Sequence, residues 1–535
     1  MNLDPHYYPA ASRRMVTFGK RGMVATSQTL AAQVGADILR NGGNAIDAAI
    51  ATAAALTVVE PTSNGIGSDA FALVWVKDKL HGLNASGRAP MGLSIDAVRE
   101  LGLDAMPAHG LTPVTVPGAP AAWSTLSERF GKLPLATLLA PAITLAEEGF
   151  AVSPVVSQLW QKAFTRYKQY NRPEFAPWFE HFAPHGHAPK AGDIWRSPDM
   201  ANTLRAMAES GANAFYEGEL ADAMDDFSRQ YSGFLRKEDL AAFTPEWVDP
   251  ISIRYRGHDI WEIPPNGSGL IALQALGMLE ALGDEPRDAV ESLHRRIEAT
   301  KLGYVDGLRY ITEREHMTPS VEQMLSPAYL AQRSELIGHE AIDPVHGNPL
   351  MGGTVYLATA DDEGNMVSFI QSNFEGFGSG IVVPGTGLSL QNRGWSFSLN
   401  EEDANVLRPG KRTYHTIIPG FITKDNQAVG PFGVMGGYMQ PQGHVQVVTS
   451  LLEDRLNPQA ALDLPRWKWV AGKTIEVEPS FPDHLAQALE RRGHHIVRTN
   501  DALTFGRGQI ILRNAATGTF QGGTEPRTDG AVLPV

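Results

Sequence analysis

The first 60 residues carry an apolar pattern typical of two consecutive helices. Apolar residues four positions apart mark one helix over residues 30–38, and Asn41-Gly42-Gly43 after it is typical of a helix end. A second apolar stripe runs through residues 46–54 and stops at Glu60-Pro61, with alanine at most of the other positions. Because alanine lets neighbouring elements approach closely, we expect this second helix to be buried.

Strands and helices are both predicted further along the chain. Residues 71–75 predict a strand after a glycine-containing loop, whereas residues 120–336 are mostly helical in pattern. Within that helical stretch, residues 251–255 and 258–263 predict two strands.

The pattern changes again between Asp343 and Gly353. This segment holds two prolines and three glycines in eleven residues, which disfavours a helix or an interior strand. We therefore expect an exposed linker. Residues 354–360 and 366–372 then predict two strands joined by a turn.

Composition limits the classes of function. The chain has 535 residues, of which 43% are hydrophobic and 19% charged, and this argues against disorder. Its net charge of −14, with no basic block, makes nucleic acid or an anionic membrane surface an unsuitable partner. It has no cysteine, which excludes disulfides, thiolate metal sites, iron–sulfur clusters and a cysteine nucleophile.

The sequence also predicts a location. The first 20 residues contain no apolar run of the kind a signal peptide needs. The longest apolar run, residues 45–59, is interrupted by Asp47 and is shorter than the roughly 20 residues of a membrane span. We therefore expect a cytoplasmic enzyme with no membrane segment.

Common catalytic motifs give no assignment. His181, His185 and His187 lie among prolines and a glycine without a carboxylate at ligand spacing, so chance histidines in a loop are the better interpretation. His494-His495 beside two arginines is typical of an exposed helix end. The chain has no phosphate-binding loop motif, no dinucleotide fingerprint and no serine-hydrolase elbow.

The Gly353-Thr354 pair suggests one specific chemistry. If the bond between them is cut, Thr354 gains a free α-amino group beside its hydroxyl. The unperturbed pKa of such an amine is about 7.7–8.0, which suits a general base, and an N-terminal amine is a recognised activator of threonine. Gly-Thr pairs are common, so from these residues alone an ordinary strand residue is the simpler interpretation.

Several segments, in order along nearly the whole chain, together resemble the γ-glutamyltransferase family. They are residues 23–27, 42–49, 60–67, 214–218 and 264–269, then Thr354, Gly436-Gly437 and residues 525–527. The resemblance implies an α+β protein with the four-layer αββα sandwich of N-terminal-nucleophile hydrolases. It also implies a precursor that cuts itself before Thr354.

The two implied pieces, residues 1–353 and 354–535, would form one structural domain as a heterodimer. A dimer of such heterodimers is left open. Thr354 would attack the Gly353 carbonyl in processing and later carry the acyl group. This chemistry needs hydroxyl, amine, hydrogen-bond donors and water, so we expect no metal and no organic cofactor.

The resemblance also assigns site residues. Ser372 corresponds to the family's threonine that contacts the nucleophile, and Gly436 and Gly437 to the glycines whose N–H groups hold the oxyanion. His415 and Thr416 correspond to two serines that hold the substrate carboxylate.

This chain departs from the family pattern at several positions. Thr354-Val355-Tyr356 replaces Thr-Thr-His, and Arg393 and Ser396 replace the glutamine and aspartate that hold a glutamyl ammonium group. The family's substrate-binding arginine falls on Ser86, with Arg88 two residues away. A carboxylate has been lost and a guanidinium gained, which suits a substrate carboxylate or a second carbonyl.

Three hypotheses follow. The first is a self-processing threonine amidohydrolase acting on a small carboxylated amide, with oxamate as the leading candidate. The second is a γ-glutamyl hydrolase or transferase acting on glutathione-like compounds. The third is an unprocessed family relative with a binding or scaffold role.

Overall fold

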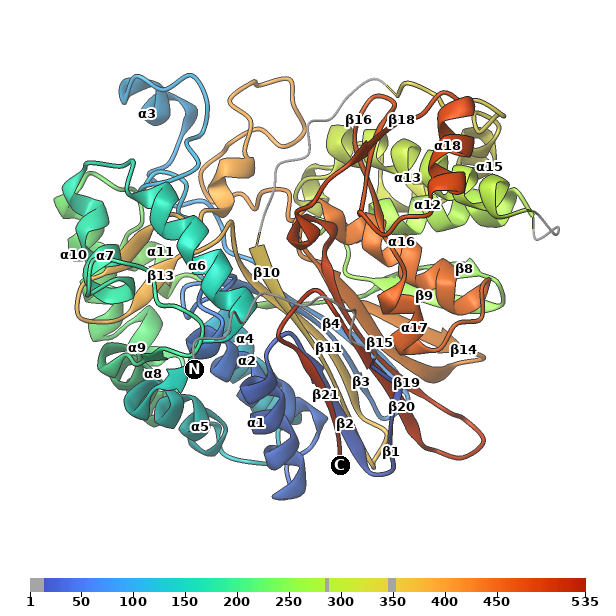
Figure 1. Ribbon diagram of the computed structural model, residues 1–535. Helices are drawn as coiled ribbons and strands as arrows, with labels where there is room; N and C mark the ends of the chain where they lie inside the picture. The colour runs from blue at the N-terminus through green and yellow to red at the C-terminus, as the bar shows by residue number, and fades with distance from the viewer. Residues whose placement is uncertain (1–13, 284–287, 345–352) are drawn as a thin grey trace.

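Two seven-stranded sheets lie face to face in the computed structural model, which describes residues 14–283, 288–344 and 353–535 (Figure 1). The first sheet has the order β21 (Ala531–Pro534), β2 (Gly22–Thr26), β10 (Gly353–Asp361), β11 (Met366–Phe374), β3 (Asp69–Val76), β4 (Lys79–Ala85), β7 (Glu246–Val248). The second has the order β1 (Thr17–Gly19), β20 (Phe520–Thr524), β19 (Arg507–Arg513), β15 (Gln427–Met435), β14 (Gly420–Lys424), β9 (His258–Glu262), β8 (Ile251–Tyr255).

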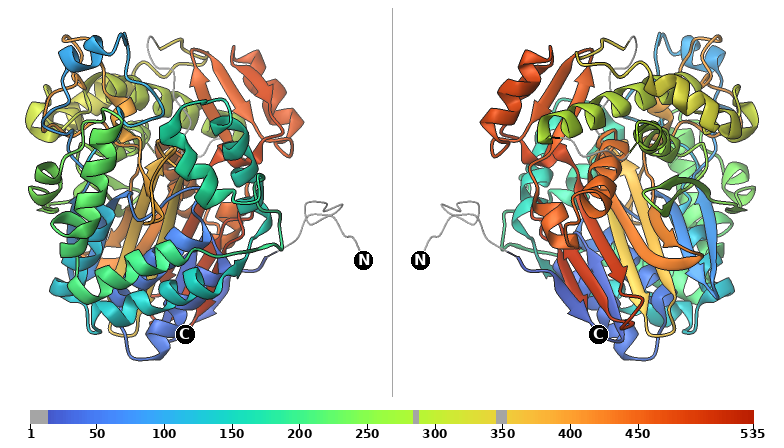
Figure 2. Two further views of the ribbon diagram at one scale, coloured as in Figure 1. Left: turned by 90° about the vertical axis from the view of Figure 1, so that its left-hand side faces the viewer. Right: turned by 90° about the vertical axis from the view of Figure 1, so that its right-hand side faces the viewer.

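Helices cover the outer face of each sheet. Over the first sheet lie α1 (Thr29–Arg40), α2 (Ala45–Val59), α4 (Ala119–Phe130) and α5 (Leu135–Glu148). Over the second lie α12 (Gly269–Ala281), α13 (Ala289–Tyr310), α16 (Met439–Leu452) and α17 (Pro458–Asp463). In the left view of Figure 2 the helices that lie outside the first sheet are in front, whereas part of the second sheet is seen directly in the right view. The expected four-layer αββα sandwich is confirmed.

Smaller elements complete the two halves. Beyond the first layer lie α6 (Pro154–Tyr167), α7 (Ala176–Phe182), α8 (Pro198–Ser210), α9 (Asn213–Tyr216), α10 (Glu219–Gln230), α11 (Lys237–Ala241), β5 (Phe150–Ala151), β6 (Ile194–Trp195), β12 (Ile381–Val383), β13 (Leu388–Leu390) and α3 (Ile95–Glu100). Near the second layer lie α14 (Val321–Met324), α15 (Pro327–Ser334), α18 (Asp483–Arg491) and a small sheet of β16 (Trp467–Ala471), β17 (Thr474–Val477) and β18 (His495–Arg498).

Helix α2 is buried along its whole length, as expected from its alanines. It begins at Asn44, whose side-chain oxygen accepts hydrogen bonds from the N–H groups of Ile46 and Asp47. Asp361, the last residue of β10, accepts a hydrogen bond from Ala45 N at 2.8 Å. A carboxylate at a helix N-terminus is favourable for the helix dipole, so this contact fixes α2 against the hairpin of β10 and β11.

The ladder around β10 is irregular at its first residues. Leu357 is the first residue of β10 that pairs with β2, so the strand starts with a neighbour on one side only. On the β11 side the register shifts between Gly353 and Val355, and two residues of β11 therefore face Thr354 alone. Such bulges re-aim side chains. Thr354 is therefore directed out of the regular ladder.

Tyr356 has a structural role between the sheets. Its ring packs against Gly433 of β15, where an added Cβ would lie 2.4 Å from the ring. Its hydroxyl is within 2.8 Å of Ser368 Oγ, and burial raises its pKa. The replacement of the family's histidine by Tyr356 therefore fills the space between the sheets.

The predicted strands at 71–75, 251–255, 258–263, 354–360 and 366–372 are confirmed, and so are the two N-terminal helices. The linker prediction lies mostly outside the described residues, which exclude 345–352, and Gly353 already belongs to β10. Both sheets combine strands from before and after Thr354, whereas the division into residues 1–353 and 354–535 stays a prediction.

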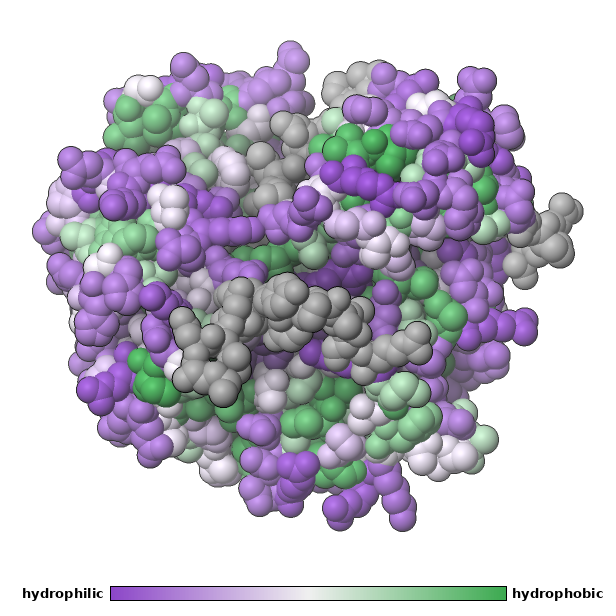
Figure 3. Space-filling model, viewed as in Figure 1, coloured by the Kyte–Doolittle hydropathy of each residue, from purple (hydrophilic) through white to green (hydrophobic). Residues whose placement is uncertain are grey.

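The surface shows no continuous apolar band on the face seen in Figure 3, where hydrophilic residues surround separate apolar patches. Large exposed apolar side chains are scattered along the chain, from Met15 to Leu464. Among the described helices, none combines the length and apolar content needed to cross a bilayer.

Replacing Asp361 by alanine tests the link between α2 and the β10–β11 hairpin. The carboxylate accepts hydrogen bonds from Ala45 N, Glu363 N and Asn365 N, so its loss leaves buried donors unpaired. We expect a loss of about 2–3 kcal/mol in the free energy of unfolding, measured as a lower Tm. Asp362→Ala, at the exposed position that follows, is the matched control and should leave Tm nearly unchanged. Equal effects of the two variants would contradict this assignment.

Candidate active site

Thr354 is fully buried at the start of β10, with a hydroxyl held from two sides. Thr354 Oγ1 donates a hydrogen bond to Ser372 Oγ at 3.1 Å and accepts one from Gln440 Nε2 at 3.3 Å. Gln440, in the first turn of α16, is itself held because its Oε1 accepts from Ile418 N at 3.0 Å. The hydroxyl therefore has a defined orientation.

Ser372 Oγ is the meeting point of three donors. Besides Thr354, Phe374 N donates to it at 2.7 Å and Arg393 Nη2 at 3.3 Å. Phe374 has a φ of 76°, a left-handed conformation uncommon for a residue with a side chain, and this turns its N–H back toward the serine. The bulge thus joins the hydroxyl of Thr354 to the guanidinium of Arg393 through one oxygen.

Arg393 is a buried guanidinium without a salt bridge in the described part of the chain. Its Nη1 donates to Thr416 Oγ1 at 2.8 Å, and its Cζ lies 4.3 Å from the centre of the Phe374 ring. Its Nε has no hydrogen-bond partner among the described residues. Burial lowers the pKa of Arg393 to about 10, so it is still charged at neutral pH. A buried charge left without a counter-ion is costly, and an anionic ligand would offset that cost.

Asp69, the acid whose charge acts on this guanidinium, has other partners. Asp69 Oδ2 lies 2.8 Å from His415 Nε2, and Asp69 Oδ1 accepts a hydrogen bond from Gly87 N. Burial, together with the charge of Arg393, lowers the pKa of His415 to about 4, so this histidine is neutral at pH 7. This contact lies beside the loop that carries Thr416. The charge of Asp69 raises the pKa of Arg393 through space, without a salt bridge between the two side chains.

Gly436 and Gly437 form the turn between β15 and α16. Their φ angles are 132° and 59°, both in the region that favours glycine, and a Cβ on Gly436 would lie 2.9 Å from Gly506 Cα. In the described ranges, neither backbone N–H has a hydrogen-bond acceptor. Gln440 N donates to Gly437 O, which ties this turn to the side chain that contacts Thr354.

Two other expected residues lie apart from this group. Ser396 is near Arg393 in sequence, and its buried Oγ has no hydrogen-bond partner among the described residues. It lines a cavity of about 800 Å³ together with Tyr414 and Tyr438. Arg88 forms ion pairs with Glu313 at 2.6 Å and Glu246 at 3.1 Å, and the structure does not bring it into contact with the other expected site residues.

Gln440 and Asp69 were not among the residues predicted from the sequence. Gln440 follows Gly437 by three residues, so a helix starting after the glycine pair would have placed it toward the same side. Asp69 lies two residues before the predicted strand at 71–75, but nothing in the sequence indicated its contact with His415.

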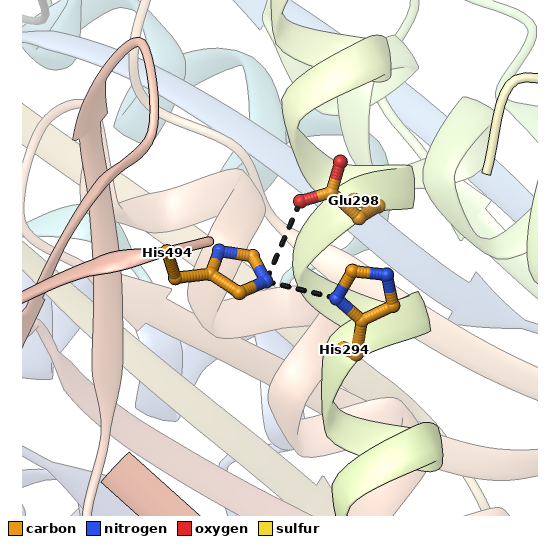
Figure 4. Close-up of side chains that lie close together, drawn as sticks. All are labelled: His294, Glu298 and His494. Atoms are coloured by element: carbon orange, nitrogen blue, oxygen red, sulfur yellow. Dashed lines mark hydrogen bonds and ion pairs between the residues drawn. The ribbon is translucent and has the colours of Figure 1, made fainter. Parts of the chain in front are cut away.

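A second buried polar cluster joins α13 to the segment before β18 (Figure 4). His294 Nδ1 lies 2.9 Å from His494 Nε2, so the expectation of an exposed helix end is wrong for His494, because the chain turns inward after α18. Two histidines and Glu298 are a donor set for zinc. Lys301 Nζ, however, already lies 2.7 Å from Glu298 Oε1 and neutralises it, so we assign this cluster a structural role.

Comparisons with known proteins agree along the whole chain. A family model described as gamma-glutamyltranspeptidase matches residues 31–535. The glutathione hydrolase-like YwrD proenzyme of Bacillus subtilis (strain 168) is 34% identical over 534 residues, covering 97% of this chain and 99% of its own. The oxamate amidohydrolase proenzyme of Klebsiella pneumoniae subsp. pneumoniae is 32% identical over 525 residues, covering 95% and 98%.

Among solved structures, a cephalosporin acylase from Bacillus halodurans is 58% identical, with a TM-score of 0.97. The match covers 100% of this chain and 99% of that protein. The whole architecture, including the arrangement of both sheets, is therefore shared with a solved relative.

Replacing Arg393 by methionine tests whether the buried guanidinium lowers the stability of the protein. Because it has no carboxylate partner, we expect Arg393→Met to leave Tm unchanged or to raise it by up to about 3 °C. Arg466→Met is the matched comparison, since Arg466 is also buried but lies 2.7 Å from Glu525 and donates to two backbone carbonyls. Its loss should cost about 2–4 kcal/mol and lower Tm. A similar fall in both variants, followed by thermal unfolding, would contradict this view of Arg393.

Proposed function

The chain belongs to the gamma-glutamyltranspeptidase family of N-terminal-nucleophile hydrolases, and within it we propose a self-processing threonine amidohydrolase. Its substrates in this proposal are amides whose acyl part carries a free carboxylate. One observation carries the substrate class: Arg393 is buried, two hydrogen bonds from the Thr354 hydroxyl, and has no carboxylate partner in the described residues.

Processing is the first step of the proposal. Thr354 Oγ1 attacks the carbonyl carbon of Gly353, the peptide nitrogen takes the hydroxyl proton and leaves as an amine, and an ester remains. Water then hydrolyses the ester, giving residues 1–353 with a new carboxylate and residues 354–535 with a free α-amino group. Glycine before the cut bond leaves room for a strained geometry. The two curated relatives are named as proenzymes, which supports this step.

The new α-amino group of Thr354 then acts as the general base. The described side-chain partners of the Thr354 hydroxyl are a serine hydroxyl and a glutamine amide, and neither accepts a proton at neutral pH. An α-amino group has an unperturbed pKa of about 7.7–8.0 and can take the hydroxyl proton. Activity toward added substrates therefore depends on processing.

The catalytic cycle uses the same groups. Thr354 Oγ1 attacks the substrate carbonyl while the α-amino group takes its proton, and the N–H groups of Gly436 and Gly437 hold the negative charge on the carbonyl oxygen. The C–N bond breaks, and the amine leaves with the proton while the acyl group stays as an ester. Water, deprotonated by the same α-amino group, then releases the acid and restores Thr354.

Arg393 and Thr416 would bind the carboxylate of the acyl part. A guanidinium binds a carboxylate through two parallel hydrogen bonds, and burial strengthens the interaction. Oxamate is the smallest amide that fits and remains the leading candidate, since a relative of similar length is named oxamate amidohydrolase. Longer half-amides of dicarboxylic acids belong to the same class. The cavity lined by Ser396 and Tyr414 offers them space.

A γ-glutamyl hydrolase or transferase is the second candidate. The observation that favours it is a pair of acids, Glu402 and Asp403, which line the same cavity as Ser396 and would suit an ammonium group. Both acids are exposed, so the attraction they offer is weaker than that of a buried partner. Turnover of a γ-glutamyl anilide, accelerated by an acceptor dipeptide, would support this candidate.

Processing is tested by intact mass and N-terminal sequencing of the wild type, Thr354→Ala and Thr354→Ser. We expect the wild type to give pieces of about 38 and 20 kDa, the smaller one beginning at Thr354. Thr354→Ala should remain whole, and Thr354→Ser should be cut because it keeps a hydroxyl nucleophile. A wild type that stays whole while correctly folded would remove the proposal.

The substrate class is tested with oxalyl, malonyl, succinyl and glutaryl half-amides, each beside its methyl ester. We expect the carboxylate form of the best length to have a kcat/KM about 100-fold higher than its ester, because one buried charge-assisted contact is lost in the ester. In Arg393→Met that preference should fall below about threefold. Release of ammonia from oxamate is measured in parallel. Equal hydrolysis of acids and esters by the processed wild type would sink the assignment of Arg393.

A further inference from the structure

Strand β15 loses its neighbour β14 shortly before the turn that leads to α16. The last pair of the two strands on this side is Gly420 with Phe432. Two residues further along this register, Ile418 would face Val434, but Ile418 lies outside β14. Both residues are buried, so their backbone N–H groups need acceptors other than the opposite strand.

Two side chains of α16 are those acceptors. Gln440 Oε1 accepts from Ile418 N at 3.0 Å, and His444 Nε2 accepts from Val434 N at 3.2 Å. The two side chains are four residues apart on a helix, so they lie on the same face. Gly443 allows the helix to approach the sheet, since an added Cβ there would lie 2.6 Å from Val434 Cγ1. Helix α16 therefore closes the gap beside the end of β15.

The contacts of His444 determine which of its ring nitrogens carries the proton. Because Nε2 accepts from Val434 N, the neutral ring carries its proton on Nδ1. Nδ1 then donates to Glu262 Oε1 at 2.6 Å. The ring also lies against Phe432, with 4.9 Å between the two ring centres. The orientation of His444 is therefore fixed from both nitrogens.

Glu262 is the final acceptor of this chain of hydrogen bonds. It is the last residue of β9 and is fully buried. Its Oε2 has no hydrogen-bond partner among the described residues, and burial raises the pKa of its carboxyl group. Burying a carboxyl group with one partner is unfavourable for folding. Stability alone therefore does not explain the pair of Glu262 and His444.

The pair holds the turn between β15 and α16 from both of its sides. On the strand side, Val434 precedes Gly436 by two residues. On the helix side, Gln440 is one helical turn before His444, and its Nε2 donates to Thr354 Oγ1 at 3.3 Å. A shift of His444 would therefore move the turn relative to the nucleophile.

We propose that Glu262 and His444 are positioning residues of the amidohydrolase: through the backbone of β15 they direct the N–H groups of Gly436 and Gly437 at the negative oxygen of the tetrahedral intermediate. Such donors stabilise the oxygen best when their direction is fixed before the charge develops. This inference rests on the proposed function and adds the residues that hold its oxyanion site in place.

The test compares an amide substrate with its thioamide, in which sulfur replaces the carbonyl oxygen that takes up the negative charge. Sulfur is larger and accepts hydrogen bonds more weakly, so accurately directed N–H groups favour the amide. The ratio of kcat/KM for the two substrates does not depend on the amount of active protein, and a merely structural role would leave it unchanged.

We expect processed wild type to prefer the amide by about 100-fold, and His444→Leu by less than about tenfold. In His444→Leu, kcat for the amide should fall by about 10–100-fold while KM changes by less than about threefold, because the lost interaction is made in the transition state.

His444→Gln is the conservative variant, since a glutamine amide offers both an acceptor for Val434 N and a donor for Glu262. It should keep the amide preference within about threefold of the wild type. His494→Leu is the matched control, because His494 is also a buried histidine and lies in the separate cluster with His294. It should lower Tm and keep the wild-type ratio.

Glu262→Leu and Glu262→Gln make the same comparison at the other residue, and they decide the question if His444→Leu yields no processed protein. Without an acceptor at Nδ1, the ring of His444 is free to carry its proton on Nε2, where it would oppose the N–H of Val434. Glu262→Leu should therefore reduce the amide preference below about tenfold, whereas Glu262→Gln keeps an acceptor and should retain the preference.

A wild-type ratio in processed His444→Leu or Glu262→Leu overturns the inference and leaves the amidohydrolase standing. Nitrogen NMR of wild type with isotope-labelled histidine gives a readout independent of turnover, with the His444 signal identified by its absence from His444→Gln. We expect a proton on Nδ1, and a proton on Nε2 overturns the inference, because Val434 N then has no acceptor on the ring. If processed wild type hydrolyses neither substrate, the proposed function fails, and the positioning role in that reaction fails with it.

Discussion

The pairing of β10 is the constraint on which the site depends. The strand is hydrogen-bonded to β2 and β11 from Leu357 onward, so its first residues cannot shift without disturbing the centre of a sheet. The bulge at Thr354 then aims one hydroxyl at Ser372, and through it at Arg393. Positions on rigid strands hold reacting groups more accurately than loops do. Gly433 of β15 and the turn of Gly436 and Gly437, which follows β15, come from the second sheet and form the other side of the site.

Buried arginines in this protein differ in whether they form a salt bridge. Arg466 is buried with a carboxylate partner, whereas Arg393 is buried with hydroxyls and an aromatic ring. Functional sites often contain groups whose burial lowers the stability of the protein. A polar group whose hydrogen bonds and charge are fully paired within the protein binds a ligand weakly. Asp69 contacts His415 and Gly87 N and acts on this guanidinium only through space, without a salt bridge.

Much of the fold could be predicted from the sequence, because its signals are local. The alanines of α2 and the alternation of residues 366–372 indicate burial, whichever element packs against them. The site was accessible only through the resemblance, since the contacts of Thr354 join residues 18 and 86 positions apart. No local pattern shows that His494 turns inward to His294, because that burial depends on elements 200 residues apart. The lack of a salt bridge to Arg393 among the described residues likewise depends on where Asp69 lies in the fold.

The interleaving of strands has a consequence for the processed molecule. In the first sheet β10 and β11 lie between β2 and β3, and in the second β20, β19, β15 and β14 lie between β1 and β9. With a cut before Thr354, the two chains therefore remain one cooperative unit. Their separation is coupled to global unfolding, so the stability of the fold depends on protein concentration and a dissociation constant for the pair cannot be separated from the free energy of unfolding.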